Sequence, residues 1–441
     1  MTTAKHIKEL IAAYEFNGYL HGALLVAQSG EIIECKGFGY ANVEHVVKNT
    51  ASTKFRIGSL TKAFTSYAIF LLQEHGKLHI EDLVSQFIGD YPNGQRMNIY
   101  HCLTNTSGIP DFASAPDFWF KTMRLPSSLD ERIEEIKAMP LSFEPGSEFD
   151  YSNSNYIVLT AIIEKVTGKS YADYMRDEIF IKFEMHNTGC DDGRKVVPNL
   201  ASGYSLWERP IHAEFADMSF PLGAYGLYST VEDLYKWDRK LKESGHLSNE
   251  IMEKLFMPYH DSYACGWIVS EVLNRRCVHH FGDISGFSSN FYRFIDDDVT
   301  IIFLSNLSIT PVTHLTGEIA RALFSEDVEL PQLIKPIPIK RLDYLLGAYY
   351  VDGNEEMQLQ ISGDANGLYL TSPKMYGVPY KYPLIPIQQE NEHTIFLTKY
   401  LNEKVVVHHS QLDGDKKLLH YLDCYGKEYI CYAVKPETDY I

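Results

Sequence analysis

The order of the predicted strands and helices is the feature that most constrains the fold. Residues 22–29 and 31–39 predict two strands around the turn Gln28-Ser29-Gly30, a pattern typical of a hairpin. Three more strands are predicted only near residues 278–280, 289–295 and 299–304. Strands on both sides of a long helical region favour an α+β fold, in which one antiparallel sheet joins early and late segments.

Helical patterns fill most of the chain between these strands. The expected cap of the helix 155–166 is Asn153 or Ser154, and its expected end is Gly168. The segment 105–111 is expected to be a loop. Helices are predicted at residues 5–14, 59–76, 129–138, 155–166, 232–241 and 316–324.

The pattern changes after residue 325. Prolines at 331, 336 and 338 and the loss of helical periodicity predict a linker. Short alternating strands from 345 to 434 then predict a small antiparallel sandwich or barrel, with turn signals at 352–354, 362–364, 366–367 and 413–415. We therefore expect a large domain at 1–328, a linker at 329–342 and a β-domain at 343–441.

Composition narrows the class of protein. The 441 residues carry a formal net charge of -18, which argues against a nucleic-acid partner. The sequence has neither a signal-peptide pattern nor a long apolar segment, so we expect a soluble, cytoplasmic protein without a membrane partner. Its 7 cysteines form no Cys-x-x-Cys pair, which favours reduced thiols. No motif calls for a metal or a cofactor, and the oligomeric state stays open.

Ser59 is the only serine that has a lysine three residues further on, at Lys62. That step places both side chains on one face of a helix. A nearby base activates a serine hydroxyl, and a helix start offers backbone N–H groups to a developing oxyanion. The alternative is a solvated helix face, but the apolar flanks and the preceding Gly58 favour a nucleophile.

Tyr151 and Asn153 form a second candidate pair. The turn before them and the helix after them place both on a loop, from which side chains project into a cleft. A phenol is a poor base at neutral pH, but a neighbouring Lys62 ammonium is expected to lower the pKa of Tyr151. For Asn153 the alternative is a purely structural helix cap.

His280 and Gly282 form the only His-x-Gly in the chain. On a strand both positions face the same side. A glycine there lets a substrate backbone lie close to the strand edge. The alternative is a half-buried histidine at a strand end; the adjacent His279 is expected to point the other way.

Together these motifs resemble the serine β-lactamase-related hydrolases, the group of class C β-lactamases, low-molecular-weight penicillin-binding proteins, D-aminopeptidases and esterases. The resemblance covers about residues 17–324 and implies a β-lactamase/transpeptidase-like sheet flanked by helices. The tail resembles the small lipocalin-like barrel of many members. Further matching segments are 106–110 (Thr-Ser-Gly-Ile-Pro), 144–146 (Glu-Pro-Gly), 162–171, 226–230 with Asp233, and 266–267 (Gly-Trp).

The resemblance also implies roles. Ser59 is expected to form the acyl-enzyme, and Lys62 and Tyr151 to share general-base and general-acid work. Asn153 is expected to bind the substrate amide and orient Lys62. The backbone N–H groups of Ser59 and Asp283 are expected to form the oxyanion hole.

The main departures from the family lie in the motif His280-x-Gly282. His280 stands where true class C β-lactamases have lysine, which weakens a β-lactamase function because a fixed cation holds a carboxylate better. Phe281 replaces a hydroxyl residue. Asn105 stands where a histidine is frequent, and Cys265 where glycine is usual; we interpret Asn105 as loop structure.

The resulting hypothesis is a serine hydrolase that acylates Ser59 and acts on D-residue peptides, amides or small esters, as D-aminopeptidases, DD-peptidases or esterases do. The alternatives are a penicillin-binding sensor that deacylates slowly and a weak β-lactamase. The expected partners are small-molecule or peptide substrates, with β-lactams as possible acylating ligands.

Overall fold

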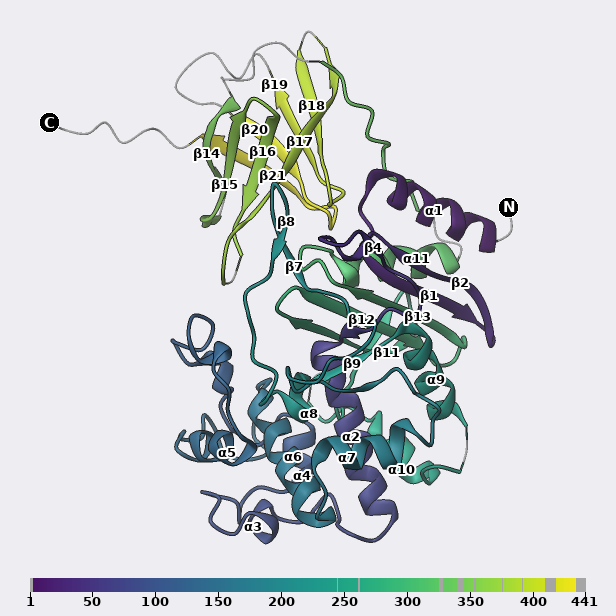
Figure 1. Ribbon diagram of the computed structural model, residues 1–441, viewed down its shortest axis with the longest axis vertical. Coiled ribbons are helices and arrows are strands. Elements are labelled where there is room, and N and C mark those ends of the chain that lie inside the picture. Colours follow the sequence, from purple (N-terminus) through teal and green to yellow (C-terminus); the bar gives the residue numbers. More distant parts are fainter. Residues whose placement is uncertain are drawn as a thin grey trace, which may run out of the picture. The chain divides into compact units, whose positions relative to one another are not determined.

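The computed structural model describes residues 3–433 apart from 244, 261, 325–327, 339–344, 353, 375, 391 and 409–417. Contacts divide the chain into two compact units, whose elements are drawn in Figure 1. The sheet unit consists of Gly22–Gly203 and Glu214–Asn306. The barrel unit consists of Met1–His21, Tyr204–Ala213 and Leu307–Ile441.

An antiparallel sheet in the order β10-β11-β12-β13-β1-β2 forms the centre of the sheet unit (Figure 1). Strand β1 pairs antiparallel with β13, and Leu25 lies opposite Ile302. The prediction that early and late strands share one sheet is therefore confirmed. The strands are β1 (Gly22–Gln28), β2 (Glu31–Phe38), β10 (Ile268–Val272), β11 (Arg275–Ile284), β12 (Phe287–Phe294) and β13 (Val299–Ser305).

The central strands are covered on both faces. Every residue of β12 and β13 is buried. Strand β13 reads Val-Thr-Ile-Ile-Phe-Leu-Ser, a nearly continuous apolar run of the kind that two covered faces require. Strand β10 was not predicted, and β11 extends well beyond the predicted 278–280 because pairing with β10 and β12 sets its length.

Helix α2 is the buried central helix of the sheet unit. Its residues from Thr61 to Leu72 are all buried, so it is covered on every side. Helix α6 ends at Gly168, which takes the left-handed conformation (φ 67°), as predicted. The helices of this unit are α2 (Thr61–Glu74), α3 (Val84–Phe87), α4 (Ile99–Leu103), α5 (Leu129–Lys137), α6 (Asn153–Thr167), α7 (Tyr171–Met175), α8 (Leu222–Tyr225), α9 (Val231–Lys242) and α10 (Asn249–Leu255).

Short pieces complete the sheet unit. A small sheet in the order β5-β9-β6 lies next to the turn that precedes α2 in sequence, and β3 pairs with β4. These strands were not predicted, since segments of two or three residues carry no periodicity. They are β3 (Tyr40–Asn42), β4 (Val47–Lys48), β5 (Phe55–Arg56), β6 (Gly189–Cys190) and β9 (Leu227–Ser229); the 3₁₀ turns are η1 (Gly58–Leu60), η2 (Phe112–Ser114) and η3 (Thr122–Arg124).

The predicted C-terminal β-structure is a closed barrel. Its strands follow the order β16-β15-β14-β21-β20-β19-β18-β17, and β16 also pairs with β17. The turn predicted at 366–367 forms, and Asp364 Oδ1 accepts from the Asn366 amide there at 2.7 Å, whereas the predicted turn at 362–364 is wrong because these residues end strand β15. The predicted turn at 413–415 lies outside the described residues. The strands are β14 (Gly347–Val351), β15 (Asn354–Asp364), β16 (Gly367–Ser372), β17 (Tyr380–Gln389), β18 (His393–Thr398), β19 (Lys404–His408), β20 (Leu418–Leu422) and β21 (Glu428–Ala433).

A hairpin from the middle of the chain adds to this barrel. Strand β7 (Tyr204–Trp207) pairs with β8 (Arg209–His212) and, in parallel, with β17. The Lys381 ammonium lies 2.6 Å from Glu208 Oε1, and Leu206 is part of the barrel core. The hairpin was not predicted, because Pro210 argues against a strand.

Two helices belong to the barrel unit as well. Helix α1 (Thr3–Asn17) packs on α11 (Val312–Leu323), and both begin earlier than predicted. Helix α1 buries Ile7, Leu10, Ile11 and Tyr14, the spacing of one helical face. Residues 328–338 contain neither helix nor strand. The domain boundaries at 328 and 343 remain predictions.

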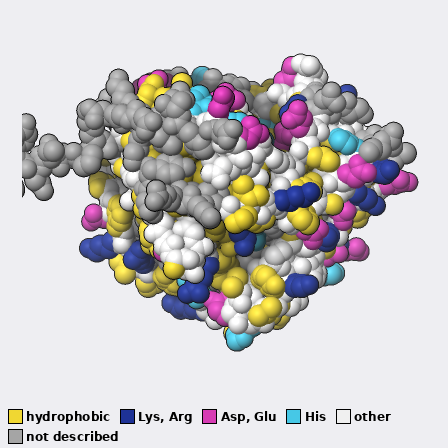
Figure 2. Space-filling view, turned by 90° about the horizontal axis from the view of Figure 1, so that it is seen from above, with side chains coloured by type: hydrophobic (Ala, Val, Ile, Leu, Met, Phe, Trp, Pro, Cys, Tyr) yellow, Lys and Arg dark blue, Asp and Glu magenta, His cyan; other side chains and the backbone are white. Residues whose placement is uncertain are grey.

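The surface carries charges of both signs. On the face that Figure 2 presents, acidic and basic side chains are interspersed with hydrophobic ones. All 7 cysteines are free thiols, and 5 of them are buried.

Candidate active site

Ser59 lies in the 3₁₀ turn η1, directly before α2, and its side chain is partly exposed. Lys62 lies in the first turn of α2 and is fully buried. Their side chains meet, with Lys62 Nζ 3.1 Å from Ser59 Oγ. The three-residue spacing therefore brings the two groups together as predicted, with the hydroxyl on the open side and the amine beneath it.

Two further acceptors surround Lys62 Nζ. Asn153 Oδ1 lies at 2.7 Å and the Ala224 carbonyl oxygen at 2.9 Å. Burial lowers the pKa of Lys62 to about 7, although the charge of Asp111 opposes the shift. A neutral amine has two N–H donors and one lone pair. It therefore can donate to Asn153 and Ala224 while it accepts the proton of Ser59.

Tyr151 lies beside Lys62, whose Nζ is 4.8 Å from the centre of the phenol ring. Burial raises the pKa of Tyr151 well above 10, and the neighbouring Tyr263 adds to this, while a hydrogen bond with Ser59 opposes it. The expectation that Lys62 lowers this pKa is therefore wrong. Desolvation disfavours the phenolate, and the lysine that was to stabilise it has a lowered pKa itself.

Asn153 is the first residue of α6, and the cap is Ser152. The prediction that Asn153 or Ser154 caps this helix is wrong. The Asn153 amide instead spans two charged groups. Its Oδ1 accepts from Lys62, and its Nδ2 donates to Asp111 Oδ2 at 3.1 Å. Asp111 Oδ1 also accepts from the Asn153 backbone N–H at 3.2 Å, so the carboxylate fixes which end of the amide faces Lys62.

His280 is 1% exposed, more buried than the half-buried histidine considered from the sequence. Its Nδ1 lies 2.6 Å from the Phe281 carbonyl oxygen, and its Nε2 lies 3.4 Å from Tyr263 Oη. A carbonyl only accepts, so Nδ1 carries the proton and Nε2 accepts from the tyrosine. Burial, aided by the charge of Lys62, lowers the pKa of His280 to about 3. The imidazole is neutral at physiological pH.

Two glycines allow β11 to approach the Ser59 turn. A Cβ on Gly282 would lie 2.3 Å from the Ile57 carbonyl oxygen and 2.6 Å from the Ser59 nitrogen. A Cβ on Gly58, where φ is +53°, would lie 2.7 Å from the Asp283 nitrogen. The structure therefore brings the backbone at Ser59 and the backbone at Asp283 close together. Strand β10 pairs with β11 only as far as His279, so it leaves this part of the edge to other partners.

Three parts of this arrangement were not assigned from the sequence. The sequence places Asp111 only in a predicted loop, and the contacts of Ala224 and Tyr263 arise from segments far apart in sequence. The Asp after Ser-Gly-Ile-Pro was the one available signal. Asn105, interpreted as loop structure, has φ +56° and accepts from the Ser152 amide through Oδ1 at 3.2 Å, which confirms that interpretation.

Among the residues that the structure describes, no group of three or more His, Cys, Asp or Glu side chains is arranged to hold a metal ion. None of the described helices combines the length and the apolar character that a membrane crossing requires.

Comparison with known proteins places this arrangement in a family. The β-lactamase family model matches residues 4–325. The chain is 32% identical over 301 residues to PbpX of Bacillus subtilis (strain 168), assigned as a penicillin-binding protein, covering 65% of this chain and 75% of the relative. It is 28% identical over 404 residues to penicillin-binding protein 4* of the same strain, covering 81% and 88%.

Solved structures share the fold. The octameric penicillin-binding protein homologue from Pyrococcus abyssi has a TM-score of 0.67 at 24% identity and covers 98% of this chain and 100% of its own. The D-amino acid amidase from Ochrobactrum anthropi SV3 has a TM-score of 0.64 at 21% identity and covers 73% and 99%. The first similarity extends over the barrel as well. The chain therefore belongs to the β-lactamase family of serine hydrolases and is a homologue of penicillin-binding proteins.

Proposed function

We propose that the protein hydrolyses amides or small esters through an acyl-enzyme on Ser59, with D-residue peptides or amides as the preferred class. One observation carries the proposal. Lys62 Nζ lies 3.1 Å from Ser59 Oγ, in a buried position that lowers the pKa of the amine to about 7. A base with a pKa near the working pH is well suited to take the serine proton.

The proposed reaction begins with acylation of Ser59. Neutral Lys62 takes the Ser59 proton while Oγ bonds to the substrate carbonyl carbon, and the N–H groups of Ser59 and Asp283 stabilise the oxyanion. Tyr151, still protonated, donates to the leaving amine or alkoxide as its bond to the carbonyl carbon breaks. Lys62 then returns a proton to Tyr151. Water hydrolyses the acyl-enzyme and restores Ser59.

Asp111 and Asn153 act as positioning residues in this scheme. The carboxylate holds the Asn153 Nδ2 end, and so Asn153 Oδ1 is presented to Lys62. The negative charge of Asp111 also limits how far the pKa of Lys62 falls. Together they keep the amine aimed at Ser59 and in balance between its two protonation states.

The neutral state of His280 bears on which substrates the site can bind. A cation at this position would pair with a carboxylate, but the imidazole is buried, uncharged and engaged by Tyr263. We therefore favour substrates without a carboxylate at that position, such as amides and esters. The fold neighbour named as a D-amino acid amidase supports this class.

A second candidate is a penicillin-binding protein that is acylated but deacylates slowly. The curated relatives named as penicillin-binding proteins favour it. The site residues are the same in both candidates, and the rate of acyl-enzyme hydrolysis separates them.

The test follows acylation and turnover together. The protein, Ser59→Ala and the control Ser52→Ala, an exposed serine, are incubated with a fluorescent penicillin, p-nitrophenyl acetate and the p-nitroanilides of D- and L-alanine. We expect turnover with a preference for the D-substrate, lost only in Ser59→Ala. A lasting adduct without product would favour the second candidate. Unchanged turnover in Ser59→Ala would refute both.

A further inference from the structure

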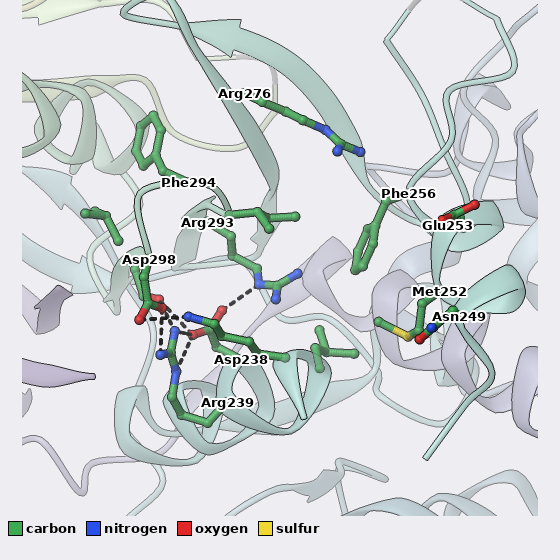
Figure 3. A pocket seen from close by; sticks show the side chains of 15 residues that line it. Asp238, Arg239, Asn249, Met252, Glu253, Phe256, Arg276, Arg293, Phe294 and Asp298 are labelled. Carbon is green, nitrogen blue, oxygen red and sulfur yellow. Dashed lines mark hydrogen bonds and ion pairs between the residues drawn. The ribbon is translucent and has the colours of Figure 1, made fainter. Parts of the chain in front are cut away.

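We propose that a second cavity in the sheet unit binds a small monocarboxylate with an apolar body (Figure 3). The cavity has a volume of about 340 Å³ and lies between helices α9 and α10 and strands β11 to β13. Its lining includes none of the residues assigned to the Ser59 site. The proposal therefore goes beyond the proposed function and does not depend on it.

Most charges of the cavity are paired, and its basic side chains exceed its acidic ones by one. Four basic and three acidic side chains line it. Asp298 is paired with both Arg239 and Lys242, at 2.7 and 2.8 Å. Asp238 is paired with Arg239 and Arg293. A net positive lining is unexpected in a chain with a formal charge of -18, and it favours a negatively charged ligand.

Arg293 is the central group, and it is only 5% exposed. Its Nε donates to Asp238 Oδ1 at 2.6 Å, and its guanidinium carbon lies 5.3 Å from the centre of the Phe256 ring. Its buried Nη1 has no hydrogen-bond partner in the described part of the chain. Leaving a buried charged donor without an acceptor is costly. A ligand oxygen at this end of the guanidinium would supply the missing acceptor.

Arg293 keeps a donor without an acceptor because Asp238 already accepts hydrogen bonds from several other groups. Besides both arginines, it accepts from Thr300 Oγ1 at 2.8 Å. Its oxygens are therefore occupied, and it has little capacity to take the remaining N–H groups of Arg293. Arg276, an exposed residue that lines the same cavity, is a further cation, and it has no acidic partner among the described ion pairs.

The remaining walls of the cavity are apolar, and they favour a ligand whose body beyond the carboxylate is a hydrocarbon. Phe256, at 7% exposed, lies next to the Arg293 guanidinium in Figure 3. A phosphate brings two charges and no apolar surface, whereas a monocarboxylate with a hydrocarbon body matches both the single excess charge and these walls. The apolar lining residues are Leu241, Met252, Phe256, Phe294, Ile295 and Val299.

The test is calorimetric titration of the full chain with sodium octanoate, with 1-octanol as the uncharged probe. Replacing Arg293 endangers folding, so two variants at the rim are used: Arg276→Gln, which removes a cation, and Met252→Trp, which fills space. Arg194→Gln, an exposed arginine outside the cavity, is the matched control. Thermal unfolding confirms that each variant is folded.

We expect saturable octanoate binding to the wild type and to Arg194→Gln, about tenfold weaker binding to Arg276→Gln and none to Met252→Trp. Octanol is expected to bind far more weakly. Absence of saturable octanoate binding, equal binding of octanol, or unchanged affinity in a folded Met252→Trp would each overturn the proposal.

Discussion

Lys62 in the sheet unit and Glu403 in the barrel unit are both ionisable side chains inside the fold, 0% and 4% exposed. Burial lowers the pKa of Lys62 to about 7 and raises the pKa of Glu403 to about 7. Their partners differ. Lys62 contacts the partly exposed Ser59, whereas Glu403 accepts from the buried Tyr382 at 2.8 Å. A pKa near neutrality is therefore common to both groups, and contact with an accessible nucleophile distinguishes the reactive one.

The strongest test of this comparison replaces each group by an uncharged analogue. Lys62→Met is expected to slow acylation of Ser59 by about 10²–10⁴-fold, the contribution of a general base. Glu403→Gln is expected to leave the acylation rate unchanged. Stopped-flow measurement of acyl-enzyme formation with both variants checks this. A comparable loss in Glu403→Gln would mean that the barrel carboxyl also serves the reaction.

The second prediction concerns stability and the Glu403 carboxyl. Its folded pKa of about 7 exceeds the ordinary 4.5, so the folded state retains the proton between these values. The protonated carboxyl therefore contributes fully to the free energy of unfolding below pH 4.5. This contribution, about 3 kcal/mol, is lost as the pH rises to about 7. Urea unfolding of the wild type and Glu403→Gln from pH 5 to 8 is the measurement. A difference between the two that stays constant with pH would contradict this assignment.

The third prediction distinguishes two effects of Asp111: it orients the Asn153 amide, and its charge raises the pKa of Lys62. Asp111→Asn removes the carboxylate that orients the Asn153 amide, and acylation is expected to slow by up to about 10²-fold. The pH at which activity begins should also fall, because the charge of Asp111 raises the pKa of Lys62. Asp117→Asn, an exposed aspartate, is the control. A slower reaction with an unshifted pH profile would assign Asp111 a packing role only.

The smallest effect is that of pH on the unmodified protein. Lys62 must be neutral to accept the serine proton, and its pKa is about 7. The acylation rate at limiting substrate should therefore rise about tenfold between pH 6 and 8 and then level off. No decline is expected up to pH 9, because Tyr151 keeps its proton there. A bell-shaped profile centred near 7 would indicate a different acid.

Local signals in the sequence account for much of the site. The Ser59–Lys62 pair was predictable because a three-residue step is a property of one helix. The pKa of Tyr151 was not, since it depends on Tyr263 and on burial by remote segments. The lowered pKa of His280 likewise depends on burial and on the charge of Lys62, which lies far from it in the chain.

The fold shows the same division. The periodic strands and the helices with clear caps or apolar faces were predicted, as was the β-structure after residue 345. The hairpin β7–β8 was not, because it is stabilised by the edge of β17, a strand more than 170 residues later in the chain. Short strands held by such distant partners have no pattern of their own.

That hairpin has a consequence for anyone who shortens the protein. A fragment that ends at residue 328 would retain β7 but lose β17, its partner in the barrel. Tyr204 and Leu206, now 3% and 0% exposed, would become solvent-accessible beside an unpaired strand edge. Such an edge pairs readily with other molecules, so we expect the truncated protein to aggregate. A soluble fragment requires removal of residues 204–213 together with the barrel.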